Sequence, residues 1–411
     1  MAVGAQLPRR RAAQVRAATE ERAAEPRPAG GEPTTVVQRH DDAAMFEADW
    51  EALCRRLHRP PQDWPAWQRC HAQAFGRGQT GYLTAHRDGR LVGVLPYERR
   101  RDAVAVPAAR PHSPAGQPVA EDEEARVALL RALGRERPRT LLWHEWRPDD
   151  WSATLVREAL LPELPRQRPG QVVSSPHVDL TRPWDALTAA WSRNYRKDLR
   201  RRRRRAEGAW TVRHEVRRGT EVSADLLERC FAIEASGWKG TEGTAIANLP
   251  HLRRFYTDVA GWAATTGWLR LDLLWFDDAL AAFQFGLQHD GVLWSLKVGY
   301  EQAHAACSPG SLLDLEVMRA GVEDPTLQRL ELGAGESRAK LQWATGSHAL
   351  HELRAFPGGV SGAVRDRADR ARQQARRQAA ERLSPAAVAR VRTVRGRTRQ
   401  LLARARTGRT A

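Results

Sequence analysis

The hydrophobic pattern predicts helices and strands in mixed order along most of the chain. Apolar residues recur every three or four positions over 45–57, which is the spacing of one helix face. Two shorter apolar runs, 82–85 and 91–97, flank an Asp88-Gly89 pair, and this combination is typical of a β-hairpin. The pattern therefore favours an α/β protein.

The second half of the chain repeats this plan. We expect helices over 184–205, 224–236, 249–265 and 311–321, a three-strand meander over 268–300, further strands at 210–216, 327–332 and 349–356, and a short turn or helix over 336–343. A turn at Asp277-Asp278 precedes a strand that begins with small apolar residues, as the Asp88-Gly89 turn does. This likeness predicts a duplicated α/β domain.

Composition shifts divide the chain into four parts. We expect a disordered N-terminal extension over 1–35, which is rich in Ala, Arg, Pro and Glu, followed by one domain over 36–172 and a second over 173–358. Residues 359–411 form an Arg-rich tail, for which we predict two helices. No apolar run approaches the roughly 20 residues of a membrane span, and no secretory signal is evident.

The formal net charge of +17 is concentrated in two places. The segment 361–411 carries fifteen arginines against three acids, and the segment 193–205 carries nine basic residues against one acid. The rest of the chain is close to neutral, so the basicity belongs to a tail and one helix. With 42% hydrophobic residues, the body has enough apolar material for a sizeable core, which excludes global disorder.

The rare residue types carry a further indication. Four cysteines show no paired spacing for zinc or a disulfide framework, so we expect a reduced, cytoplasmic protein. Only four of the 66 basic residues are lysines, and all of them lie within 197–340: Lys197, Lys239, Lys297 and Lys340. Because lysine is a compact charge whose pKa shifts readily, the clustering of all four lysines indicates a reactive or binding site within this stretch.

The segment 293–311 is the sharpest candidate for a site. A strand over 293–300 leads through a loop to a helix that opens with Ser308-Pro309-Gly310-Ser311. Unpaired N–H groups at a helix start attract anions, and glycine lets a phosphate approach closely. The same four residues are also an ordinary helix start, so the sequence leaves both interpretations open.

Several motifs in order resemble the GNAT superfamily, and within it the Fem-like and cellulose-biosynthesis (CelD-type) acyltransferases. The motifs are the helix WSRNYRKDLRRRRRR at 191–205, Gly237-Trp238-Lys239-Gly240, Arg254-Phe255-Tyr256, Leu296-Lys297-Val298-Gly299-Tyr300, Ser308-Pro309-Gly310, and Lys340 with Trp343. They cover roughly 175–356. The resemblance implies tandem GNAT-like domains with mixed, mostly antiparallel sheets, the second domain catalytic and the first degenerate, followed by the Arg-rich helical tail.

The resemblance also implies an activity. A GNAT enzyme moves an acyl group from acetyl-CoA or another acyl-CoA directly to an amine, here of a sugar, cell-envelope or metabolite acceptor, without a metal. The residues that it assigns to the acyl-CoA are Lys297, Val298, Ser308, Pro309, Gly310 and Ser311. Glu301 is the first candidate base and Glu234 the second, with Tyr300 as the acid. The substrate contacts would be Arg196, Arg200, Trp238, Lys239, Lys340 and Trp343.

The sequence departs from both families. A single Gly310 stands where the usual GNAT phosphate loop has two glycines, and the coiled-coil insertion of Fem enzymes is absent. Two alternatives therefore stay open: a Fem-like transferase that uses aminoacyl-tRNA, and an inactive acyltransferase fold that binds nucleic acid. The tail could serve tRNA, an anionic membrane surface or an acidic partner, or it could be a solvated extension.

Three other patterns are weaker. His304 and Cys307 share one loop, but no carboxylate is evident to orient a Cys nucleophile. His348 and His351 are three apart in a strand-like segment, which places their rings on opposite faces and disfavours a metal site. Gly333-Ala334-Gly335 lacks the third glycine of a dinucleotide fingerprint.

Overall fold

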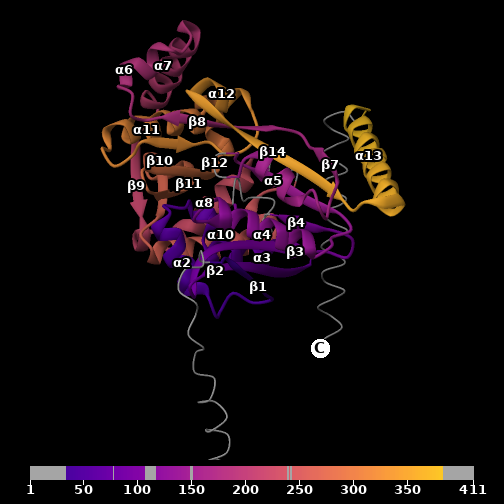
Figure 1. Ribbon diagram of the computed structural model, residues 1–411. Helices are drawn as coiled ribbons and strands as arrows, with labels where there is room; N and C mark the ends of the chain where they lie inside the picture. The colour runs from indigo at the N-terminus through magenta and orange to yellow at the C-terminus, as the bar shows by residue number, and fades with distance from the viewer. Residues whose placement is uncertain are drawn as a thin grey trace, which may run out of the picture. The chain divides into compact units, whose positions relative to one another are not determined.

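One sheet of fourteen strands runs through the part of the chain that the computed structural model describes (Figure 1). That part comprises residues 34–76, 78–106, 117–148, 151–237, 240 and 243–382. The strands are β1 (Val36–His40), β2 (Gln79–Arg87), β3 (Arg90–Arg99), β4 (Val104–Val106), β5 (Val119–Ala120), β6 (Leu141–Trp146), β7 (Arg166–Pro169), β8 (Val173–Asp179), β9 (Val212–Arg218), β10 (Leu269–Phe276), β11 (Ala279–His289), β12 (Val292–Tyr300), β13 (Arg329–Glu331) and β14 (Gly346–Phe356).

Helices cover this sheet. They are α2 (Glu47–Arg56), α3 (Pro65–Phe75), α4 (Glu123–Arg135), α5 (Ala153–Leu160), α6 (Trp184–Ala189), α7 (Arg193–Glu207), α8 (Ala224–Ser236), α10 (Pro250–Thr265), α11 (Pro309–Glu323), α12 (Arg338–Trp343) and α13 (Gly359–Arg382), with short 3-10 turns η1 (Pro61–Asp63), η2 (Gly219–Glu221), η3 (Ile246–Asn248) and η4 (Gln302–Cys307). The predicted mixed α/β class is confirmed. In the described residues, none of these helices has the length and apolar character needed to cross a membrane.

One predicted helix is two. The sequence indicates a single helix over 184–205, whereas the structure breaks it into α6 and α7 between Ala189 and Arg193. The Ser192 hydroxyl accepts a hydrogen bond from the Tyr195 N–H at 3.2 Å, which caps a new helix. Because of this break, the basic helix α7 is a separate helix from α6.

The strand pairings repeat. The strands β1-β2-β3-β4-β6 are joined by three antiparallel pairings and then a parallel one. The strands β9-β10-β11-β12-β13 show the same order of antiparallel and parallel pairings. The turn residues Asp88 and Asp277 both adopt positive φ, 51° and 50°, and each hairpin carries a register shift just before its turn. This repeat supports the predicted duplication, and the large sheet is mostly antiparallel, as expected.

The proposed domain boundaries at 172/173 and 358/359 stay predictions, because the sheet is continuous across the first of them. β14 pairs with β8 through residues 346–350 and with β6 and β7 through residues 351–356. The last strand of the second half is therefore also a strand of the first half.

The second half of the sheet is covered on both faces. On one face, Trp67 of α3, Phe231 of α8 and Phe255 of α10 pack on Phe283 and Phe285 of β11. On the other face, the buried side chains of α7 and α11 pack on β10, β11 and β12: Leu199, Leu312, Leu313, Leu274, Ala282 and Leu293. We refer to these as the α8 face and the α11 face.

The start of the tail is a helix, as predicted. α13 is held to the body by Asp366 and Asp369, which form ion pairs with Arg168 of β7, and Asp369 also pairs with Arg354 of β14 at 3.1 Å. The second predicted tail helix begins beyond residue 382 and lies outside the described residues, as does nearly all of the predicted disordered extension 1–35.

Candidate active site

Strands β12 and β13 separate along their length. They pair in parallel only where Val292–Trp294 meets Arg329–Glu331, while β12 continues for six more residues to Tyr300. In the described residues, β13 offers no partner to this second part of β12. The backbone edge of 295–300 is therefore open at the point where the two strands diverge.

A bulge at Leu296 decides which side chains face which helix. Phe285 pairs with Lys297 and the next residue, Gly286, pairs with Ser295, so Leu296 is an extra residue. Leu293 lies on the α11 face, but Leu296 packs on the α8 face and Lys297 also reaches α8. Strict alternation would put Lys297 on the α11 face. The bulge instead places Lys297 on the α8 face, and it places Val298 and Tyr300 on the α11 face.

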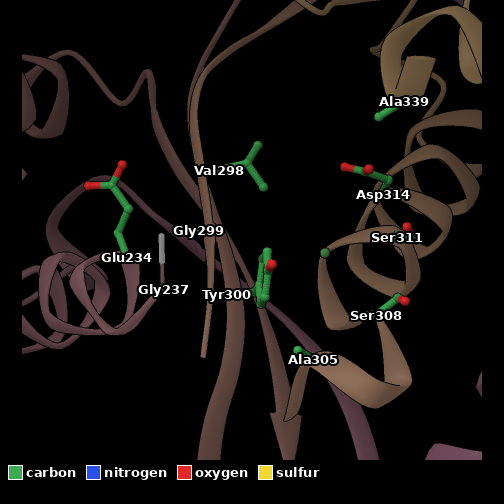
Figure 2. Close-up of a pocket in the computed structure, with 11 residues that line it drawn as sticks. Glu234, Gly237, Val298, Gly299, Tyr300, Ala305, Ser308, Ser311, Asp314 and Ala339 are labelled. Carbon is green, nitrogen blue, oxygen red and sulfur yellow. The ribbon is translucent and has the colours of Figure 1, made fainter. Parts of the chain in front are cut away.

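A cavity of about 350 Å³ opens at the end of β12. It is lined by Glu234, Gly237, Val298, Gly299, Tyr300, Ala305, Ser308, Gly310, Ser311, Asp314 and Ala339. In Figure 2, Val298 and Tyr300 point from β12 toward α11, Asp314 points into the space between them, and Glu234 lies on the other side of the strand. The cavity thus brings together β12 and the start of α11, as the sequence predicts.

Glu234 and Lys297 form a buried ion pair on the α8 face. Lys297 Nζ is 2.9 Å from Glu234 Oε1, and the side chains are 13% and 1% exposed. Glu234 Oε2 accepts a hydrogen bond from the Ile246 N–H at 2.8 Å, and the Lys297 ammonium lies 5.8 Å from the centre of the Tyr256 ring. Both carboxylate oxygens are engaged, so this arrangement fixes the ammonium in place.

The first turn of α11 offers a backbone donor to the cavity. Ser308 adopts a left-handed conformation at φ 50°, and its carbonyl accepts hydrogen bonds from the N–H groups of Ser311 and Leu312 at 3.0 and 3.2 Å. Pro309 has no N–H, so Gly310 supplies the remaining N–H of this turn. That donor lies at the positive end of the helix, where an anionic group binds favourably.

An arginine of α7 lies beside the first turn of α11. Arg202 NH1 lies 3.3 Å from the hydroxyl of Ser311, which lines the cavity, and Asp198 pairs with the same guanidinium at 2.6 Å. Arg203 pairs with Glu316 at 3.0 Å and ties α7 to α11. The first turn of α11 therefore has a guanidinium group beside it.

The sequence did not single out Arg202. Of the predicted arginines, Arg200 is exposed and Arg196 is half-buried, and neither lines the cavity. One signal in the sequence could have indicated Arg202, namely the apolar stripe that α7 buries. This stripe contains Leu199 and Ala206. Arg202 occupies the helical position between these two residues, so it faces α11.

Asp314 is a second residue that sequence reasoning missed. It lies one turn after Ser311, beside an aromatic group in which the Trp343 ring is 4.8 Å from Trp191 and 5.3 Å from Tyr195. Burial raises the pKa of Asp314 to about 7, although a hydrogen bond with Trp343 acts in the opposite direction. A carboxyl group with this pKa can exchange a proton near neutral pH.

The predicted substrate contacts Lys340 and Trp343 have partners within the protein. Lys340 Nζ donates hydrogen bonds to the carbonyls of Gly333, Ala334 and Gly335 at 2.9, 3.1 and 3.1 Å. Trp343 is buried and forms a hydrogen bond with the Asp314 carboxyl group. The Gly333-Ala334-Gly335 segment, a weak dinucleotide motif in the sequence, therefore binds the Lys340 ammonium group through its carbonyls. Gly333 and Gly335 both have positive φ.

The remaining predicted residues divide into two groups. Val298, Tyr300, Ser308, Gly310 and Ser311 line the cavity, and Pro309 is buried beside them. Glu301 instead caps η4 by accepting a hydrogen bond from the Ala303 N–H at 3.3 Å. Trp238 and Lys239 lie outside the described residues.

The loop thiol has a structural environment. Cys307 is buried, and His304 packs edge-on against Trp210 and Phe276 with ring centres 5.0 and 5.1 Å away. The other three cysteines are also buried, and all four are free thiols. This geometry gives no support to a Cys nucleophile in that loop.

One cluster has the composition of a metal site. In the described residues, ligand atoms of His177, Glu331 and His348 lie within 4.8 Å of one another, whereas the His351 ring packs at an angle against Trp146. Arg147 and Arg329 both contact the Glu331 carboxylate, at 3.2 and 3.0 Å. A divalent cation there would meet two guanidinium groups, so the surroundings favour an anion over a metal.

The comparisons with known proteins agree with this geometry. The GNAT acetyltransferase domain family matches residues 193–341, which include α7, α8, β12 and α11. No protein with a curated description matches the sequence.

Two solved structures share the fold. A conserved protein of unknown function from Bacteroides thetaiotaomicron VPI-5482 is 12% identical, with a TM-score of 0.52 over 79% of this chain and 100% of that one. FemX is 10% identical, with a TM-score of 0.52 over 78% of this chain and 97% of its own. Residues 193–341 therefore match the GNAT acetyltransferase domain, and both halves of the chain share their fold with these two structures.

Proposed function

We propose that this chain is an N-acyltransferase that moves an acetyl or longer acyl group from coenzyme A to an amine. The single observation that carries the proposal is the cavity where β12 leaves β13 and α11 begins, because it lies within the matched GNAT domain. The acceptor is an amine of a sugar, cell-envelope precursor or metabolite, in line with the CelD-type resemblance.

The geometry supports a role for the start of α11 in donor binding. The Gly310 N–H and the Arg202 guanidinium would hold the pyrophosphate of coenzyme A, since both lie at the positive end of the helix. The open backbone edge of 295–300 would direct N–H groups at the thioester carbonyl and stabilise the negative charge that develops on its oxygen.

The proton of the attacking amine needs an acceptor. The predicted bases are otherwise engaged, because Glu234 is ion-paired to Lys297 and Glu301 caps η4. Asp314 points into the cavity and has a pKa of about 7, so we place proton acceptance at its carboxylate. Tyr300, which lines the same cavity, would protonate the departing thiolate.

A second donor is favoured by a specific surface. The outer side of α7 exposes Arg200, Arg201, Arg204 and Arg205, and the fold is shared with FemX. A run of exposed arginines suits a phosphate backbone, so aminoacyl-tRNA is the alternative donor. In either case the first half would shape the acceptor groove, and the tail would be a further surface for an anionic partner.

A transfer assay separates the two donors. The full chain would be mixed with glucosamine or spermidine and either acetyl-CoA or a pool of charged tRNA, with thiol release and the mass of the product followed together. We expect acetylated amine and free coenzyme A in equal amounts. Aminoacylated product from charged tRNA alone would move the function to the Fem-like alternative, and no product from either donor would contradict the proposal.

A further inference from the structure

A second hollow region lies at the opposite end of β12 from the candidate active site. Two cavities of about 350 and 530 Å³ adjoin there and share Asp290, Val292, Gln328 and Arg329 as lining residues. His58 and Arg147 of the first half also line the larger cavity. None of these residues lines the cavity at α11, so the two regions are separate.

Two arginines are fixed at this hollow by one buried carboxylate. Glu331 is 1% exposed, and its Oε1 lies 3.2 Å from Arg147 NH2 and 3.0 Å from Arg329 Nε. The Arg147 guanidinium also stacks over Trp294, 5.3 Å from the ring centre, and the Arg147 side chain is only 14% exposed. Both guanidinium groups are therefore positioned before any ligand arrives, which lowers the entropic cost of binding.

Several buried polar atoms around the hollow have no hydrogen-bond partner. In the described residues they include Nε of Arg147, Nε2 of His289 and Nδ1 of His177. Arg147 Nε is a donor, and a histidine ring nitrogen donates or accepts according to its tautomer. A buried polar atom of either kind is costly without a partner, so these atoms indicate a ligand or water. Glu331 Oε2 is a buried acceptor in the same position, which a hydroxyl group of the ligand would satisfy.

Two acids line the hollow, and both have partners. Asp290 pairs with His58 at 2.8 Å, and Asp179 accepts from the Thr181 hydroxyl at 2.6 Å and from Arg182 at 3.2 Å. Arg147 and Arg329 share the single charge of Glu331, so this group of three carries one net positive charge. An anionic group that contacts Arg147 and Arg329 would neutralise this remaining charge.

We propose that this hollow binds the carboxylate or phosphate group of a small hydroxylated molecule, with Arg147 and Arg329 as its two ligands. The site goes beyond the proposed acyl transfer, because it uses none of the residues at the start of α11. The ligand would touch both halves of the chain, since Arg147 follows β6 and Arg329 opens β13.

The test is a titration of the full chain with inorganic phosphate and with malate, followed by calorimetry and by the midpoint of thermal unfolding, against chloride at equal ionic strength. We expect saturable binding that weakens at least 10-fold in Arg147→Gln and Arg329→Gln. Arg204→Gln, which alters an exposed arginine of α7 that lines neither site, should bind with unchanged affinity. A preference for phosphate or for malate identifies the anionic group.

Removing one arginine leaves Glu331 with less compensation and could unfold the chain. The double variant Arg147→Gln with Glu331→Gln keeps the buried charge balanced and serves in that case. Saturable binding in the wild type that is lost in this variant supports the proposal. An absence of saturable binding of either anion to the wild type would overturn it, as would an unchanged affinity in the double variant.

Discussion

The Asp314 carboxyl lies at the cavity, beside the Trp343 ring of α12, which packs against the Tyr195 ring of α7. The sequence could not reveal it, because an aspartate in the second turn of an amphipathic helix is ordinary, and its environment is created by Trp343, 29 positions later in the printed chain. Lys297 and Glu234 show the opposite case. Both were predicted as site residues, but only the bulge at Leu296 brings them to the same face.

The raised pKa of Asp314 predicts a pH dependence of stability. Because its pKa is about 7 in the folded chain and near 4 when unfolded, the folded state holds the proton more tightly between these values. The contribution of this group to the free energy of unfolding therefore falls as pH rises from about 4 to 7 and is level above 7.

The variant Asp314→Asn should lose this dependence. Relative to the wild type, we expect it to gain on the order of 2 kcal/mol of unfolding free energy between pH 5 and pH 8, measured by urea unfolding of both proteins. If the two proteins respond to pH in the same way, Asp314 titrates as an exposed carboxyl group does, and its assignment as proton acceptor fails.

At the scale of elements, local patterns were readable and the contacts between elements were not. The order of strand β12, loop and helix α11 could be predicted because each has its own apolar spacing and start signal. The docking of α7 on α11 joins Arg202 to Ser311, which are 109 residues apart. Nothing in the local pattern of α7 says which helix its apolar stripe will meet.

This docking predicts a role for one arginine of α7. Arg202→Gln should weaken the binding of acetyl-CoA about 10-fold, because the guanidinium next to Ser311 would pair with a phosphate. Arg204→Gln is the matched control on the same helix, since Arg204 is exposed. Affinities of the two variants from calorimetry at low salt should differ clearly. Equal affinities would show that α7 acts only through its overall charge.

At the scale of the whole molecule, strand pairings join the two halves, and these pairings have no local signal in the sequence. β14 pairs with β6 and β7 at one end and with β8 at the other, and a register shift between His351 and Leu353 accompanies the change. The duplication was visible in two similar turns, and the repeated order of pairings agrees with it. That the halves share one sheet became clear only in three dimensions, because strand pairing over such separations leaves no local signal.

The central claim is that the cavity at α11 binds an acyl-CoA, and titration calorimetry of the full chain with acetyl-CoA tests it most directly. A Cβ at position 310 would lie 3.7 Å from Tyr300, so Gly310→Leu places a side chain in the cavity. Gly261 in α10 is exposed and has nothing within 4 Å, so Gly261→Leu is the matched control. We predict saturable binding by the wild type and Gly261→Leu and none by Gly310→Leu. Equal binding by all three proteins, or no binding by the wild type, would contradict the account.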